Sequence, residues 1–193
     1  MLATSSSTFD PIVDAHQIRS LAIGQRMAVT SLQMARMTAA IATGKITAPR
    51  LLLTLNGQQA EPTADVPLGV ELRRVRQGMK AVVETGTGAT AFAGPEWNGV
   101  RPLIFGKTGS AEMGEPGSED VCTADRRGQA RKLKIAWFVG YVNAGVIPGY
   151  DRPIAFATTI SHDCETGGAH AAKIIASLLN ALRQPVQGAQ AST

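Results

Sequence analysis

The sequence predicts an α+β fold built around an antiparallel sheet of at least three strands. Stretches with apolar residues at helical spacing occupy the first half of the chain and its end. Between them lie short apolar runs bounded by Gly, Pro, Asn and Asp, as is typical of strands. The order of two helices, three strands and one helix is an α+β pattern. With 44% hydrophobic and 18% charged residues among 193, the composition excludes a disordered chain or a collagen-like fibre.

Two helices are expected before the strands. Thr30 is a suitable N-cap for a helix over residues 30–42, because Gln33 follows three positions later and completes a capping box. Gly44 is placed to end this helix. A second helix is expected over residues 70–85, where the apolar residues recur at helical spacing. Of the intervening chain, residues 49–56 are expected to be extended and residues 56–67 to form a loop.

The three strands and the last helix follow a long loop expected over residues 89–100. Residues 103–112, 134–142 and 153–161 should form one antiparallel sheet, with the strand that contains Lys107 at an edge. A hairpin connection is expected over residues 143–152. A helix over residues 168–183 should pack on one face of the sheet, and residues 185–193 are expected to be a disordered tail.

The charge pattern does not indicate a nucleic-acid-binding protein. The net charge is +4, and the charge is not concentrated on an expected recognition helix. The basic residues around position 130 fit a solvated loop, and contact with an anionic polymer is the alternative. No apolar run approaches the ~18 residues of a transmembrane helix, and the first residues lack the pattern of a secretory signal.

Neither a metal nor a cofactor is expected. The chain has two cysteines, Cys122 and Cys164, which cannot complete a zinc site without other ligands. The three histidines, His16, His162 and His170, give none of the usual metal-binding spacings with them.

The tripeptide Lys107-Thr108-Gly109 is the main candidate for a functional site. It is not part of a phosphate-binding loop, because Arg101 stands where that motif requires a glycine. A K-T-G element is also one of three motifs of active-site serine acyl-enzymes, together with S-x-x-K and S-x-N.

The surrounding sequence resembles the transpeptidase domain of penicillin-binding proteins, which belong to the β-lactamase-like superfamily. Five landmarks occur in the order of that family and together span most of residues 20–183. They are residues 23–42, 78–88, 105–112 and 136–141, and Gly167-Gly168 with the closing helix. Three substitutions depart from the family pattern: Arg26 stands for Gly, Ser31 for Pro, and Ser110 for the second Thr of K-T-G-T.

The resemblance is to the C-terminal half of such a domain. No serine in the chain has a lysine three residues later, and S-x-N does not occur. The nucleophile is therefore unknown. The domain organisation expected from this resemblance is a loose segment over residues 1–20, the C-terminal portion of a transpeptidase domain over residues 21–184, and the tail.

The resemblance also assigns roles to four residues. The backbone N–H of Ser110 corresponds to an oxyanion donor, and Lys107 supplies positive charge for the carboxylate of a substrate or a penicillin. The hydroxyls of Thr108 and Ser110 would contact the same carboxylate, and Gly109 would let the acyl chain lie close to the strand.

The implied function is that of a D,D-transpeptidase fragment in peptidoglycan cross-linking, inactive alone. Completed by an N-terminal half, it would take stem peptides ending in D-Ala-D-Ala, or β-lactams. The alternative is a small hydrolase or esterase, or a binding module, that uses another serine such as Ser110. The family works on the periplasmic or extracytoplasmic side of the bacterial membrane, where a disulfide between Cys122 and Cys164 is possible. Because the family's N-terminal strand is missing, the edge of residues 154–160 is expected to be unpaired and open to self-association.

Overall fold

The computed structural model describes residues 8–9, 14–22, 24, 27–50, 54–59, 64–112, 121–122, 131–164 and 166–184. Its helices are α1 (Ala15–Ala22), α2 (Ser31–Thr43), α3 (Arg73–Glu84) and α4 (Ala171–Arg183), with short 3₁₀ helices η1 (Ala89–Phe92), η2 (Pro95–Trp97) and η3 (Arg101–Leu103). The long strands are β7 (Ile104–Glu112), β10 (Lys134–Val142) and β11 (Ile154–Asp163). The short strands pair as β1 (Thr8–Phe9) with β2 (Met27–Ala28), β3 (Lys45–Ile46) with β6 (Val66–Pro67), β4 (Thr54–Leu55) with β5 (Gln58–Gln59), and β8 (Val121–Cys122) with β9 (Arg131–Lys132). The predicted α+β class is confirmed.

The three long strands form the predicted antiparallel sheet, in the order β11-β10-β7. The strand that carries Lys107 lies at one edge, as expected from the sequence. Lys107 pairs with Val139 on β10, and Val139 pairs in turn with Ala157 on β11.

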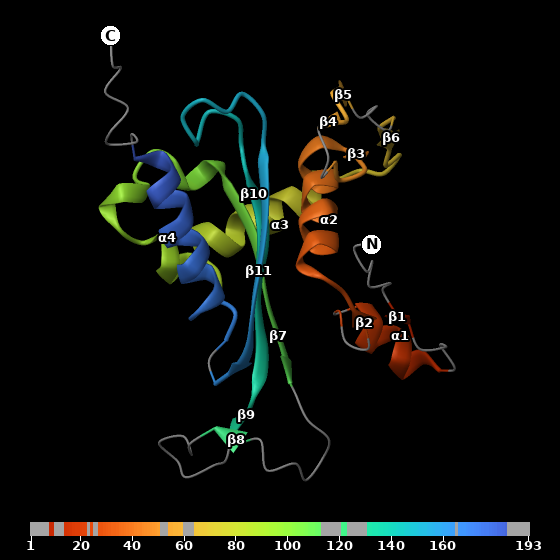
Figure 1. The fold of residues 1–193 in the computed structure, drawn as a ribbon. Coiled ribbons are helices and arrows are strands. Elements are labelled where there is room, and N and C mark those ends of the chain that lie inside the picture. Colours follow the sequence, from red (N-terminus) through yellow and green to blue (C-terminus); the bar gives the residue numbers. More distant parts are fainter. Residues whose placement is uncertain are drawn as a thin grey trace.

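Helices cover both faces of this sheet. Figure 1 shows the sheet from its edge, with α4 on one side and α2 on the other. Both helices pack on β10 and β11, whereas α3 packs against β7. The two faces are called here the α4 face and the α2 face.

The main core lies on the α4 face. Phe138 is fully buried there, with its ring 5.9 Å from that of Phe92 and 5.5 Å from that of Phe156. Gly106 and Gly140 leave room for these rings, since a Cβ on Gly106 would lie 2.4 Å from Phe138 Cζ. A Cβ on Gly140 would lie 2.0 Å from the carbonyl oxygen of Phe105, so the close approach of β7 and β10 requires glycine at this position.

Helix α2 begins and ends as its sequence predicts. The hydroxyl of Thr30 accepts a hydrogen bond from the Gln33 N–H at 3.2 Å, and the Thr30 N–H donates to Gln33 Oε1 at 2.7 Å. This reciprocal pair is the capping box. Gly44 ends the helix with φ of +78°, a left-handed conformation that glycine adopts without a steric cost.

Three arginines hold helix ends and loops in place. Arg76 of α3 donates to the carbonyl of Ile41 at 2.8 Å, near the end of α2. Arg101 donates to the carbonyl of Val83 at 3.0 Å, near the end of α3. Arg183 of α4 donates to the carbonyl of Glu96 at 2.7 Å. Since carbonyls at a helix C-terminus lack partners within the helix, these contacts fix α3 and α4 to their neighbours.

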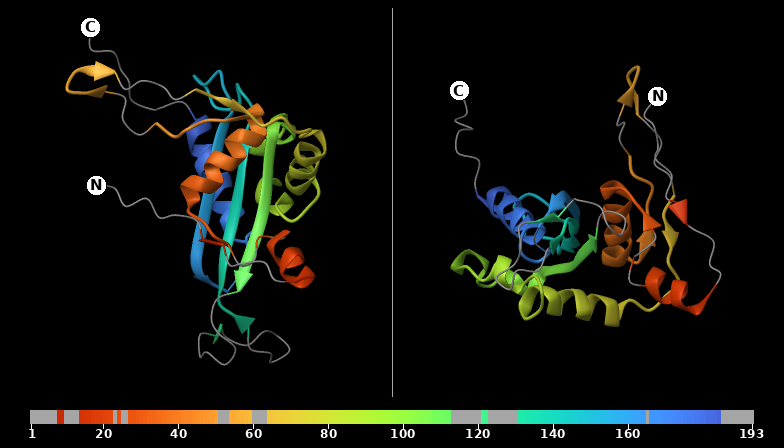
Figure 2. Two further views of the ribbon diagram at one scale, coloured as in Figure 1. Left: turned by 90° about the vertical axis from the view of Figure 1, so that its right-hand side faces the viewer. Right: turned by 90° about the horizontal axis from the view of Figure 1, so that it is seen from below.

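The segment between α2 and α3 differs from the prediction. Residues 54–59 and the pair β3–β6 form two-stranded ribbons, which extend from the body as an arm (Figure 2). The turn at its tip is Asn56-Gly57, with φ of +51° and +80°. Asn-Gly between paired strands is a strong hairpin signal that the sequence interpretation did not use. Residues 51–53 and 60–63 lie outside the described residues.

Smaller differences concern boundaries. The loop expected over residues 89–100 contains η1 and η2. The last helix begins at Ala171, because residues 167–170 form turns before it. Helix α1 crosses the boundary that was expected between residues 20 and 21. The division of the chain into three segments stays a prediction. The tail expected over residues 185–193 lies outside the described residues.

Candidate functional site

Strand β7 presents the four candidate residues in alternating directions. Successive side chains of a strand point to opposite faces of its sheet. Lys107 borders a cavity on the α2 face, whereas the hydroxyls of Thr108 and Ser110 make contacts with segments that do not border it. The candidate residues therefore divide into a cationic side and a hydroxyl side.

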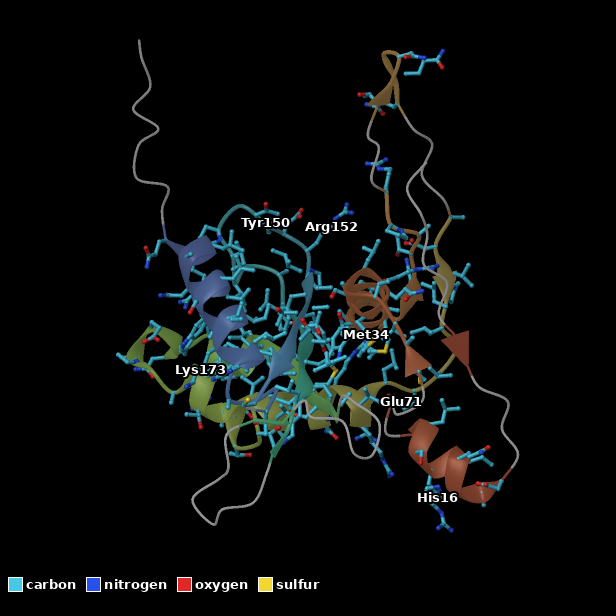
Figure 3. The ribbon with its side chains drawn as sticks, turned by 60° about the horizontal axis from the view of Figure 1, so that its bottom comes forward. His16, Met34, Glu71, Tyr150, Arg152 and Lys173 are labelled. Atoms are coloured by element: carbon cyan, nitrogen blue, oxygen red, sulfur yellow. The ribbon has the colours of Figure 1, made fainter. Side chains whose placement is uncertain are left out.

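The cavity beside Lys107 has a volume of about 440 Å³ and lies between α2, α3 and the sheet. Its walls are mainly apolar and include Met34, Met37 and Met79, with Arg74 and Lys107 as the cations among its lining residues. Met34 is labelled on α2 in Figure 3, and its side chain is one of those that border the cavity. The cavity combines flexible methionine walls with two positive charges, which suits an apolar segment joined to an anion.

Lys107 is exposed, and its ammonium group donates to the carbonyl of Thr108 at 2.5 Å. This contact keeps the charge next to the backbone of the edge strand. An ammonium has three donors, so the remaining two can reach a carboxylate brought to the strand.

The hydroxyl side is fixed by two contacts. Thr108 Oγ1 lies 2.6 Å from Thr87 Oγ1, in the turn that follows α3. Ser110 Oγ accepts a hydrogen bond from the Gly167 N–H at 3.2 Å. Gly167 lies so close to the sheet that a Cβ there would be 2.2 Å from the carbonyl oxygen of Trp137. The turn before α4 is thus packed directly on β7 and β10, behind Lys107.

Two of these residues were not identified from the sequence as parts of the site. Thr87 entered the sequence analysis only within the family landmark of residues 78–88, and Gly167 only as a family landmark. The alternation of side chains along β7 is the signal that would have separated Thr108 and Ser110 from Lys107.

Tyr141 lies two strand positions from Val139 on β10 and stacks on Phe105, with the ring centroids 4.5 Å apart. Burial raises the pKa of its phenol, and the nearby Arg76 guanidinium opposes this shift. The phenol is therefore held neutral, and it forms part of the packing on the α2 face.

Cys164 is disulfide-bonded. The only other cysteine of the sequence is Cys122, whose side chain lies outside the described residues. Across the described part of the chain, no three or more His, Cys, Asp or Glu side chains come together as a possible metal site, so no ligand set can be named. No described helix has the length and hydropathy needed to span a bilayer.

The chain was compared with protein families and with curated proteins. No curated protein matches the chain significantly. The family described as the penicillin binding protein transpeptidase domain matches residues 5–180, which is most of the sequence. The chain therefore belongs to the penicillin-binding protein transpeptidase family.

Proposed function

We propose that this chain is the C-terminal portion of a D,D-transpeptidase domain acting in peptidoglycan cross-linking. The observation that carries the proposal is the position of Lys107, on an edge strand beside an apolar cavity between α2 and α3. Its substrate class is the stem peptide ending in D-Ala-D-Ala, with β-lactams as mimics, on the extracytoplasmic side of the membrane.

Acyl transfer requires a nucleophile, a base and donors for the developing oxyanion. Of these, the chain supplies the donor and the anion site. The backbone N–H of Ser110 is the proposed oxyanion donor, and Lys107 binds the substrate carboxylate. The nucleophile and its base come from a segment with S-x-x-K and S-x-N, which this sequence does not contain.

The contacts on the hydroxyl side support a positioning role there. Thr87 and Gly167 contact Thr108 and Ser110 on the side of β7 opposite Lys107, and these contacts hold the strand in place. A fixed strand keeps the oxyanion donor and the Lys107 ammonium at a constant separation, and such preorganisation is the main source of electrostatic catalysis. In this arrangement the two hydroxyls position the strand, and Lys107 carries the contact with the carboxylate.

The test is labelling with a fluorescent penicillin. The chain alone should give no covalent band, because it lacks the nucleophile. When it is mixed with an N-terminal transpeptidase portion that carries S-x-x-K and S-x-N, a band should appear on that second polypeptide. Lys107→Ala should reduce labelling about tenfold or more through loss of a charged contact, whereas Lys45→Ala, at an exposed lysine of β3, should leave it unchanged.

The same gel separates the alternative. A covalent band on the 193-residue chain by itself would show that a serine of this chain is reactive and would contradict the proposal. Turnover of a simple ester, lost in Ser110→Ala and without a penicillin band, would instead indicate a small hydrolase built on this scaffold.

A further inference from the structure

The disulfide bond at Cys164 is a feature of the described chain that the proposed function does not use. Cys164 is partly buried and disulfide-bonded, and no free cysteine is found among the described residues. The sequence contains one other cysteine, Cys122. A disulfide within the chain can therefore join only these two residues.

The strand register brings both cysteines to the same end of the sheet. Asp163, the neighbour of Cys164, pairs with Lys134 at the start of β10. Cys122 in β8 pairs with Arg131 in β9, three positions before Lys134. Figure 1 shows β8 and β9 at the end of the sheet where β7 and β11 stop. This placement suits a disulfide, which joins Cα atoms about 4.4–6.8 Å apart.

We propose that a disulfide between Cys122 and Cys164 holds the turn before α4 against β7, and that thiol–disulfide exchange at this bond sets how firmly β7 is held. The bond joins the chain that follows β7 to the chain that follows β11, with β10 between the two strands. A cross-link of this kind reduces the number of conformations open to the closed segment, residues 122–164.

The turn between Cys164 and α4 connects the bond to the candidate site. Gly167 follows Cys164 by three positions, which span at most about 10 Å of extended chain. Its N–H donates to Ser110 Oγ at 3.2 Å. Within the turn, the carbonyl of Thr166 accepts a hydrogen bond from the Ala169 N–H at 2.9 Å. A displacement of Cys164 is therefore passed through a short, hydrogen-bonded turn to the contact with Ser110.

The same turn fits closely between two other segments. A Cβ on Gly168 would lie 2.0 Å from the carbonyl oxygen of Thr87, just as one on Gly167 would collide with the carbonyl oxygen of Trp137. Closely packed segments transmit small displacements to their neighbours. Release of the turn at Cys164 should therefore loosen its contacts with β7. The disulfide stands independently of the proposed function, and only its effect on Ser110 as an oxyanion donor rests on that function.

The chemistry of the bond is thiol–disulfide exchange. In the dithiol form, the thiolate of one cysteine attacks a sulfur of an external disulfide, such as oxidised glutathione, and one glutathione leaves as its thiol. The second cysteine attacks the sulfur of the first in this mixed disulfide, and the second glutathione leaves. Two protein thiols are oxidised, one external disulfide is reduced to two thiols, and the protons of the protein thiols end on the leaving groups. Exchange with an external dithiol reverses these steps.

Peptide mapping of the full chain tests the pairing. After incubation with oxidised glutathione and alkylation without reduction, one linked pair of peptides containing Cys122 and Cys164 is expected, in a chain of monomer mass. Two alkylated cysteines would overturn the proposal, and so would a disulfide that joins two copies of the chain.

Hydrogen exchange of the oxidised and the dithiothreitol-reduced chain tests the effect on the turn. Reduction should speed exchange of the Gly167 amide about tenfold or more, because local opening becomes easier. The Gly44 amide, which donates to the Ala40 carbonyl at 2.8 Å at the far end of α2, should change less than about twofold. Equal exchange of Gly167 in both states would overturn the proposal. An equal rise at Gly167 and Gly44 would do so too, because it would make the bond a general staple.

Variants separate the bond from the local packing of each cysteine. Cys122→Ser and Cys164→Ser should each give the fast Gly167 exchange of the reduced chain, and dithiothreitol should then have no further effect. Ser161→Ala, at an exposed residue of β11 near Cys164, should change Gly167 exchange less than about twofold. Unequal effects of the two cysteine variants, or a remaining response to dithiothreitol, would contradict the proposal. If a variant fails to fold, the comparison of oxidised and reduced unmodified chain still decides.

The labelling assay with an N-terminal transpeptidase portion connects this bond to the proposed function. Cys164→Ser should weaken the fluorescent penicillin band about threefold or more, since a misplaced donor slows the reaction. A complete absence of labelling in the unmodified chain would count against the proposed function alone, because the mapping and exchange measurements use neither penicillin nor the second polypeptide. Equal bands for the unmodified chain and Cys164→Ser would overturn the effect of the bond on Ser110.

Discussion

The α4 face of the central sheet carries a closed core, whereas the α2 face contains a cavity. On the α4 face, Phe138 and Ala171 are fully buried, and the aromatic rings of three different elements meet. On the α2 face, Met37 of α2 borders a cavity and is 43% exposed. The cavity beside Lys107 opens on that second face.

This difference separates the face that carries the buried core from the face that carries the candidate site. The α4 face carries the buried core of the described residues, although the outer side of α4 also exposes Ile174, Leu178 and Leu182. On the α2 face, Met37 borders the cavity next to Lys107, the residue proposed to bind the substrate carboxylate. The part of the α2 face next to this cavity is where another segment is expected to bind.

The largest expected effect comes from removing the central ring of the α4 face. Phe138→Ala should lower the free energy of unfolding by about 3–5 kcal/mol, because it creates a cavity in a closed core. Met37→Ala, on the α2 face, should lower it by less than about 1 kcal/mol, since that side chain is already partly in water. Urea unfolding of both variants measures the difference. Equal losses would show that the two faces are equally complete.

Two glycines sharpen the comparison. Gly140→Ala places a Cβ against the backbone of β7 and should cost about 1–3 kcal/mol. Gly78→Ala, in α3 beside the cavity, meets nothing within 4 Å and should stabilise the chain by about 0.5–1 kcal/mol. Thermal unfolding of the pair reports both signs. A stabilised Gly140→Ala would mean that β7 and β10 are not held at this separation.

A smaller effect is expected at the start of α2. Thr30→Ala removes the capping box and should cost about 1 kcal/mol. Thr90→Ala, at an exposed residue of η1, serves as the control and should change stability by less than about 0.5 kcal/mol. Equal urea midpoints for the two variants would show that the cap does not hold α2 on the sheet.

The smallest effect concerns pH. Burial raises the folded-state pKa of Tyr141 above its unfolded value of about 10. The stability that comes from the neutral phenol is therefore fully present below about pH 10 and is lost as the pH rises through the folded value. Unfolding midpoints should fall more steeply above pH 10 in the unmodified chain than in Tyr141→Phe. Parallel pH profiles would show that Tyr141 is not buried on the α2 face.

The sequence predicted those elements whose signals are local. The caps of α2 are set by Thr30, Gln33 and Gly44, which lie within a few residues of the ends that they define. The strands are set by short apolar runs with turn residues at both ends. The start of α4 could not be placed in this way, because Gly167 is held by contact with a distant strand rather than by its neighbours.

The sequence likewise predicted only part of the candidate site. The position of Lys107 on an edge strand follows from the sequence, whereas the cavity beside it depends on how α2 and α3 pack together. The pairing of Thr108 with Thr87 joins residues 21 positions apart and has no local signal. In both cases the missing information is tertiary.

Hydrogen exchange on the full chain, with and without an N-terminal transpeptidase portion carrying S-x-x-K and S-x-N, tests the central claim most directly. The claim is that the α2 face, with Lys107, is one half of an acyl-enzyme site that needs another segment. Amide protection should rise in α2 and in β7 around Lys107 when that portion is added, while α4 changes little. No change in α2 and β7, or an equal rise across α4, would contradict it.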